Sequence, residues 1–522
     1  MNTYRWMATL ALAAGFAHGA HGAGFDSDPF FYDPAFNSNG IYVDGIAGAN
    51  GACLEQRCDG MRVARLSNGD IVTAVELYSF QSDGVGGGSQ SDGDFALVRY
   101  NAAGQRVAWS APTAAYAHYN NQYLLWPNND TSAGRMVSHV VDVKAVNGYI
   151  YVMFEYTDAS DSSNNDTRTG LTVFNEAGQW KQTRYRLLCQ IGECSDNGLG
   201  LAVVAEYGEP VRLLAVASTW IYGDLANRGV KTKGMTLASD GIAWDDPDFG
   251  DANSRNFFSI PTTLCRPEVR PCAFSLRRVT TAVDHPDYDS TTLYLVGDVK
   301  WNNSSDINDP DNNVLVVKMN RLGYPVTSFG TGGFQSIAFN ADGKWNDKGA
   351  AIVAEGSTDQ GGDYHGNVYV AANVGQYSVG LTKLDGATGA VVTSFGTGGL
   401  SIKGGRHCDV PGCVFINFPE AAAYAMAKEG DRLVVVGTKP STGIDNVRIA
   451  PPLFAVARAG DGRFTEFAQK PVPGGDATFL DVLALGDGRY AISGSAYPTG
   501  GGRLAVTARL RADRIFGDGV DP

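Results

Sequence analysis

Short runs of alternating apolar and polar residues recur along the chain, separated by turns rich in glycine and asparagine. β-Branched and aromatic residues dominate these runs, and a pattern of this length and period is typical of half-buried β-strands. Glycine and asparagine tolerate the positive φ of tight hairpins, so the turns indicate antiparallel neighbours. The pattern therefore predicts an all-β fold.

Two strand signals each occur seven times. One reads "DIVTAVELY", "YIYVMFEY", "RLLAVAST", "TLYLVGDV", "NVYVAANV", "RLVVVGTK" and "RYAISGSA". The other follows it and reads "DFALVRY", "GLTVF", "GMTL", "VLVVKM", "SVGLTKL", "LFAVARA" and "LAVTARL". With one strand before each pair and one after it, the unit has four strands. The third copy, near Gly234–Trp244, is the weakest.

The turn "VTSFGTGG" occurs twice, at Val326–Gly333 and Val392–Gly399, after the third strand of two consecutive units. Seven four-stranded antiparallel units predict a seven-bladed β-propeller, because one blade cannot bury both faces of its sheet alone. An open array of hairpins, or two smaller β domains, is the alternative. We expect a single domain over 24–522, with blades at 60–115, 136–188, 198–250, 274–340, 348–405, 414–470 and 476–512.

The beginning of the mature chain predicts how the ring closes. "YDPAFNSNGIYVD" (Tyr32–Asp44) looks like a degenerate copy of the repeated turn with its following strand, yet it precedes the first full unit. A lone half-unit would be unpaired unless it completes the last blade. We therefore expect Gly40–Asp44 to add a strand to the blade formed by Phe479–Leu510.

These motifs carry a family resemblance. The "SFGTGG" turn, the segment "DGDFALVRYNAAG" (Asp92–Gly104) and the opening "DPAF" resemble the delta-60 repeats of exported bacterial proteins. The closing "RIFGDGVD" is similar to a short C-terminal tail of exported proteins in some Gram-negative bacteria. The resemblance implies an exported, propeller-like protein and brings no catalytic residues with it.

The first 23 residues read as a signal peptide. Arg5 supplies the positive region, "WMATLALAAGFA" the apolar segment and "AHGAHGA" the small residues that precede cleavage. A retained anchor is the alternative, although the apolar run is short for a bilayer and no later stretch approaches a membrane span. We expect a monomer without a membrane span, located in the periplasm or outside the cell.

Composition narrows the partners. The net charge is −14, which disfavours nucleic acid because phosphate contacts need clustered Lys and Arg. All eight cysteines lie in four close pairs, so local disulfides are predicted, with a zinc ion shared between two pairs as the alternative. These pairs are Cys53–Cys58, Cys189–Cys194, Cys265–Cys272 and Cys408–Cys413.

The long connections predict where a ligand would bind. In a meander the short turns fall on one side of the ring, and the long loops and all four cysteine pairs fall on the other, which we take as the binding face. Two of these loops carry aspartates that would suit calcium, although neither fits the EF-hand pattern, and solvated loops that cap strand ends are the favoured alternative. These candidate ligands are Asp158, Asp161 and Asp166 in one loop and Asp306, Asp309 and Asp311 in the other.

Candidate catalytic residues are few. His139, in "VSHVVDV", falls on an expected inner strand and either faces the channel or is a structural histidine. No catalytic residue, and no cofactor other than calcium, follows from the sequence. We expect a non-enzymatic propeller that binds a protein or glycan partner. The alternative is a hydrolase or lyase acting on carbohydrate or a lactone at the channel mouth, where carboxylates from several blades would converge.

Overall fold

A computed structural model of the 522-residue chain describes the ring and most of its turns. The described residues are 31–33, 35–38, 40–44, 57–80, 91–118, 120–126, 135–158, 167–189, 194–204, 210–221, 228–251, 253–264, 274–283, 291–300, 312–339, 347–356, 366–375, 378–404, 422–438, 452–469, 472, 475–498 and 504–511.

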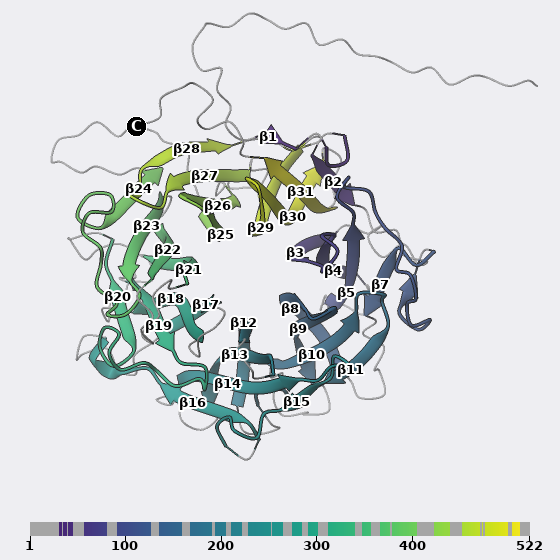
Figure 1. Ribbon diagram of the computed structural model, residues 1–522, viewed down its shortest axis with the longest axis horizontal. Coiled ribbons are helices and arrows are strands. Elements are labelled where there is room, and N and C mark those ends of the chain that lie inside the picture. Colours follow the sequence, from purple (N-terminus) through teal and green to yellow (C-terminus); the bar gives the residue numbers. More distant parts are fainter. Residues whose placement is uncertain are drawn as a thin grey trace, which may run out of the picture.

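Seven antiparallel sheets are arranged as a closed ring around a central axis (Figure 1). We number the blades 1 to 7 by their innermost strands, which are β3 (Arg57–Arg65), β8 (Arg135–Val146), β12 (Cys194–Val204), β17 (Phe274–Val283), β21 (Lys348–Ala354), β25 (Ala422–Glu429) and β29 (Gly475–Gly486). The second strands are β4 (Ile71–Phe80), β9 (Tyr149–Asp158), β13 (Arg212–Ile221), β18 (Thr291–Lys300), β22 (Asn367–Val374), β26 (Arg432–Thr438) and β30 (Arg489–Pro498). The seven-bladed propeller predicted from the sequence is confirmed.

The outer half of each blade follows the same order. The third strands are β5 (Ser91–Tyr100), β10 (Thr167–Asn175), β14 (Arg228–Leu237), β19 (Asn312–Met319), β23 (Ser378–Asp385), β27 (Pro452–Arg458) and β31 (Leu504–Arg511). Blades 1 to 6 end with β7 (Tyr123–Trp126) and β6 (Ala117–His118), β11 (Trp180–Arg184), β15 (Ala243–Asp245) and β16 (Arg255–Ser259), β20 (Phe334–Ile337), β24 (Leu400–Gly404) and β28 (Phe464–Gln469). Among the described residues the only helical segment is one 3-10 turn, Thr262–Leu264.

The N-terminal segment closes the ring, as predicted. β2 (Ile41–Asp44) and β1 (Phe31–Tyr32) both pair with β31 and so complete blade 7. Arg509 of β31 donates from Nε to the Asp33 carboxylate at 2.7 Å, and both side chains are buried. Closure therefore rests on backbone pairing and on a buried ion pair between the two ends of the chain.

The repeated turn joins each blade to the next. Phe329 and Phe395 occupy the same position in the two identical copies, and both are fully buried. The glycine after each phenylalanine donates its N–H to a turn of the following blade, from Gly330 to the carbonyl of Thr388 at 2.8 Å and from Gly396 to Asp461 at 2.7 Å. The two copies thus make the same contact at successive blade junctions.

The N-terminal copy makes this contact too. Phe36 is fully buried, and Asn37 donates to the carbonyl of Ala103 in blade 1 at 2.7 Å. The receiving turn needs a glycine because the phenyl ring of Phe36 lies against it. A Cβ on Gly104 would stand 2.6 Å from Phe36. The same close approach joins Phe395 to Gly462 in blade 6. The motif recurs because each of these junctions places a buried aromatic side chain against a glycine of the next blade.

The described residues include no helix long and apolar enough to cross a membrane.

The hydrophobic core lies between neighbouring blades. One cluster, for example, joins Leu214 and Val216 of blade 3 to Leu293 and Leu295 of blade 4. Stacking of this kind explains why the blades form a ring rather than separate sheets.

Candidate functional site

All seven inner strands carry a β-bulge at the same register. A bulge adds one residue to a strand, sharpens its twist and redirects its side chains. In each blade the bulge directly follows the inner-strand residue that pairs with the sixth residue of the second-strand signal. The bulges fall at Gly60/Arg62, Val140/Asp142, Gly198/Gly200, Leu276/Arg278, Gly349/Ala351, Ala423/Ala425 and Phe479/Asp481.

Beside these bulges the second strands place a polar residue in every blade. We call this set the polar ring: Glu76, Glu155, Ser218, Asp298, Asn373, Thr438 and Ser495. Three of its members, Glu76, Glu155 and Asn373, bind the backbone of the inner strand of the next blade. Glu155 accepts the N–H of Gly198 at 2.6 Å, and Asn373 accepts the N–H of Ala423 at 2.7 Å. Each accepted N–H belongs to the residue just before a bulge, so the polar ring fastens neighbouring inner strands together.

A cavity of about 300 Å³ occupies the channel beyond the bulges, and all seven inner strands contribute to its wall. Its residues lie on the C-terminal halves of these strands, so it lies toward the side of the short hairpin turns. The charged residues on its wall are Asp142, Lys144, Arg278, Lys428 and Asp481. The sequence predicted the binding face on the opposite side of the ring, where the long loops lie. These loops fall outside the described residues, so a binding face on that side remains a prediction.

The cavity's charges are fixed by hydrogen bonds to neighbouring blades. Asp142 accepts the N–H of Leu201 at 2.9 Å, and Asp481 accepts that of Val63 at 3.0 Å. Arg278 donates to the carbonyl of Leu480 at 2.9 Å. Because β17 and β29 belong to non-adjacent blades (Figure 1), this last bond ties two sides of the channel together.

A second guanidinium ties blades 1 and 2 below the cavity. Arg62 is buried and donates from Nε to the carbonyl of Val141 at 2.6 Å. Burial and, after it, the charge of Arg278 lower the pKa of Arg62 to about 10, against the opposing charges of Asp481 and Asp142. The channel therefore contains a compact group of opposite charges held by the ring itself.

His139 lies on the inner strand β8, as predicted, next to two carboxylates. Its Nδ1 is 2.8 Å from Glu76 Oε1; the His139 side chain is 37% exposed and that of Glu76 only 3%. Glu76 also accepts the N–H of Val140. Burial raises the pKa of Glu155 and the charge of Glu76 adds to this, while His139 opposes it. A buried carboxylate thus orients a half-exposed imidazole beside a second, protonatable acid, which is an arrangement suited to proton transfer.

The bulges of blades 4 and 6 present a different pair of side chains. Their bulged residues are Arg277 and Tyr424. Arg277 pairs with Asp298 of the polar ring at 3.1 Å. Burial raises the pKa of Tyr424, with Tyr497 adding to the shift and Arg277 opposing it. A cation and a phenol are therefore available here as hydrogen-bond donors to a ligand.

Most residues that the sequence proposed as ligands lie outside the described part. Asp158 ends β9 without a described side chain, and Asp161, Asp166, Asp306, Asp309 and Asp311 fall in undescribed loops. Among described residues no group of three or more His, Cys, Asp or Glu side chains could hold a metal ion. The calcium sites remain a prediction.

The cysteine pairs are described in part. Cys58 and Cys189 are buried half-cystines. Their partners' side chains, and the pairs Cys265–Cys272 and Cys408–Cys413, lie outside the described residues. The four pairings therefore remain predictions. Trp126 packs against Tyr116 and Phe95 in the core.

The sequence reasoning missed the polar ring, although a signal for it exists. In every second-strand signal the seventh residue is polar and follows a mostly apolar run. Aligning the seven copies would have revealed the ring. The channel charges Arg62, Asp142, Arg278 and Asp481 have no such signal, because the inner strands share no common residue there.

No family model and no curated protein matches the chain. Three solved structures are similar in fold. They are the polysaccharide lyase Uly1 (11% identity, TM-score 0.40, 87% of this chain and 89% of that chain), the GH93 α-L-arabinofuranosidase of Fusarium graminearum (13%, 0.37, 78% and 95%) and the α-L-arabinanase of Penicillium chrysogenum (10%, 0.35, 88% and 94%). Likeness at these values does not assign a function to this chain.

Proposed function

We propose that this protein is an exported β-propeller that binds a glycan or protein partner, and that a polar group of this partner enters the axial cavity. The observation that supports this is the cavity of about 300 Å³ walled by all seven blades. Pockets of roughly this size and larger bind small molecules or parts of larger ones. Export is part of the proposal and rests on the signal peptide and the delta-60 resemblance.

This cavity suits ligand binding better than catalysis because its charged side chains already hydrogen-bond to the backbone of other blades. Asp142 and Asp481 hold backbone N–H groups of neighbouring blades, and Arg278 holds a carbonyl across the channel. Charged groups fixed in this way present a preorganised surface, which reduces the entropy that a ligand must offset. Lys144, 37% exposed and bound to Asp142 at 3.0 Å, is the group best placed to meet a ligand.

A glycan-array screen combined with a panel of hydrolase and lyase substrates tests this proposal on the mature protein. We expect at least one glycan or protein ligand and no turnover. Lys144→Gln should weaken binding of that ligand, whereas Arg458→Gln, in an exposed ion pair on blade 6, should not. Turnover of any substrate would replace binding by catalysis.

The group of Glu76, His139 and Glu155 favours a second candidate function, acid–base catalysis on a carbohydrate. Under this hypothesis His139→Gln abolishes turnover without loss of stability. Asn373→Ala is the matched control, because it removes a polar-ring contact of similar geometry that has no acid or base. It should lower stability and leave turnover per folded molecule unchanged.

A further inference from the structure

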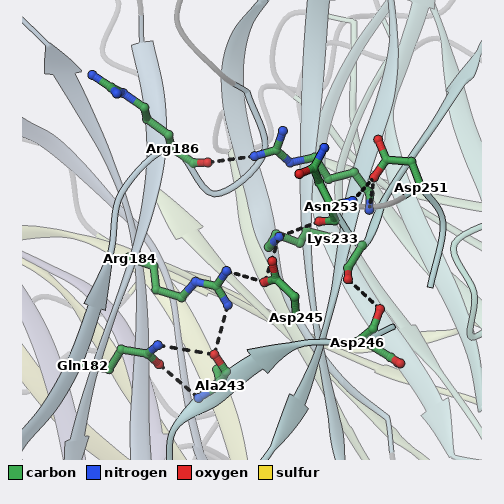
Figure 2. A network of polar contacts seen from close by, with 11 residues as sticks. Gln182, Arg184, Arg186, Lys233, Ala243, Asp245, Asp246, Asp251 and Asn253 are labelled. Carbon is green, nitrogen blue, oxygen red and sulfur yellow. Dashed lines mark hydrogen bonds and ion pairs between the residues drawn. The ribbon is translucent and has the colours of Figure 1, made fainter. Parts of the chain in front are cut away.

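Blades 2 and 3 enclose a second cavity at the outer edge of the ring, far along each sheet from the channel strands. Its volume is about 260 Å³, and it lies among β11, the residues that follow β11, and strands β14 to β16. The side chains on its wall include Arg184, Lys233, Arg255 and Asp245. Arg186 also contributes, but its side chain points away from the group in Figure 2, and its carbonyl accepts a bond from Arg255 at 3.2 Å.

Three cations and a single carboxylate therefore share the wall of this cavity. Lys233 Nζ is 2.9 Å from Asp245 Oδ1, and Arg184 donates to the same oxygen (Figure 2). Lys233 and Arg255 are both more than nine-tenths buried. The nearby Asp246 and Asp251 do not balance the charge: Asp246 pairs with Arg212, and Asp251 accepts backbone N–H groups.

The group has a cationic excess that the described residues leave uncompensated. Burial lowers the pKa of Lys233, and the charges of Arg184 and Arg255 lower it further against the pull of Asp245. The buried Nε of Arg255 has no hydrogen-bond partner among the described residues. Buried cations are costly unless they are paired, so an anion in this cavity would offset both the repulsion and the unmet donor.

We propose that the cavity between blades 2 and 3 binds an oxyanion, namely a carboxylate, sulfate or phosphate group. Two guanidinium groups and an ammonium supply several donors, and the planar guanidinium matches the oxygen spacing of such anions. A volume of about 260 Å³ accommodates one charged group or one acidic sugar residue rather than an extended ligand. The site lies apart from the axial cavity and does not depend on the function proposed for it.

The test is calorimetric titration of the mature protein with sodium sulfate, sodium phosphate and an oligogalacturonide, at constant ionic strength maintained with sodium chloride. We expect saturable binding of at least one of these probes. A methyl-esterified, neutral form of the oligogalacturonide should not bind at this site. Sulfate or phosphate binding as strong as the oligogalacturonide indicates a free ion as the ligand, and much stronger binding of the oligogalacturonide indicates an acidic glycan.

The variants separate an anion site from a purely structural cluster. Arg255→Gln should weaken binding by roughly tenfold or more, because it removes charge-assisted donors. Asp245→Asn removes the one carboxylate on the wall and should strengthen binding by roughly tenfold. A purely structural role predicts a loss of stability from Asp245→Asn and no gain in affinity. Arg458→Gln, on the surface of blade 6, is the control and should leave affinity unchanged.

Two results would overturn the proposal. One is the lack of saturable heat with all three acidic probes. The other is an affinity that does not rise in Asp245→Asn. Asp245 is partly exposed, with 43% of its side chain accessible, so this variant keeps the test available even where Arg255→Gln does not fold. Neither result bears on the axial cavity, whose ligand is screened separately.

Discussion

The ion pair between Asp33 and Arg509 provides a direct test of ring closure. Asp33 precedes β2, Arg509 belongs to the last strand, and their side chains are 3% and 5% exposed. Asp33→Asn removes the charge but keeps an oxygen that can accept the N–H of Ala35, which Asp33 Oδ1 accepts now at 2.9 Å. The substitution therefore leaves a buried guanidinium without its counter-charge while changing little else.

The expected cost follows from that burial. Breaking a buried ion pair by removing one partner costs about 3–5 kcal/mol, because the remaining charge stays desolvated. For a chain of about 500 residues the unfolding entropy is roughly 1 kcal/mol/K, so the melting temperature should fall by about 3–5 °C. Differential scanning calorimetry measures this shift. Arg509→Met combined with Asp33→Asn removes both charges and should recover part of the loss.

The matched control is the exposed ion pair Arg489–Asp487 in the same blade. The distance from Arg489 Nη2 to Asp487 Oδ2 is 3.3 Å, and the two side chains are 38% and 89% exposed. Asp487→Ala should cost less than about 1 kcal/mol, since exposed pairs are screened by solvent. A shift for Asp33→Asn no larger than that of the control, or no recovery in the double variant, would refute closure through this contact.

Three further predictions concern the junctions, a buried acid and the loops. Phe329→Ala should lower the free energy of unfolding by about 3–5 kcal/mol in calorimetry, because it empties an interblade plug. Burial raises the pKa of Asp196 from 3.8 to about 6, so the folded state binds the extra proton and stability should fall by about 2 kcal/mol as pH rises from 4 to 6; Asp196→Asn should remove this slope. Calorimetric titration with calcium tests the predicted loop sites, and no heat at millimolar calcium would remove them.

The fold could be predicted from the sequence because its repeated contacts use repeated residue types. A phenylalanine followed by glycine, and a glycine in the next turn to receive it, serve successive junctions, so Phe329 and Phe395 lie in identical octapeptides. Even the weak third unit has this contact, since Phe249 is fully buried and stands 2.8 Å from the Cβ position of Gly323 in blade 4. The segment "DPDF" that carries Phe249 matches the N-terminal "DPAF" closely enough to have identified it.

The candidate sites could not be predicted in the same way because they depend on register rather than residue type. The polar ring uses carboxylate, amide and hydroxyl side chains for one geometric task, so no single residue type repeats. Each channel charge, such as Arg62 or Asp481, follows a bulge, which shifts the strand by one residue and changes which side chains face the channel. Only the paired strands reveal that shift.

The polar ring also shows which property of its side chains the contact between blades requires. Asn373 fastens its neighbouring blade with a neutral amide at 2.7 Å, so the contact needs an acceptor but no charge. Glu155 makes the equivalent contact with a carboxylate whose pKa burial raises, which means that its ionised form is disfavoured in the folded state. At this position the chain retains an ionisable carboxyl group that the contact does not require, and this group lies beside His139.

Glu155→Gln should have opposite effects on stability and on function. Glu155→Gln keeps an oxygen for the N–H of Gly198 and removes the cost of ionisation, so at neutral pH the melting temperature should stay unchanged or rise. Glu155→Ala leaves that N–H unsatisfied and should cost about 1–3 kcal/mol. If the acid serves proton transfer with His139, Glu155→Gln loses that activity while remaining stably folded. Equal destabilisation by Gln and Ala would show instead that the carboxylate itself holds blades 2 and 3 together.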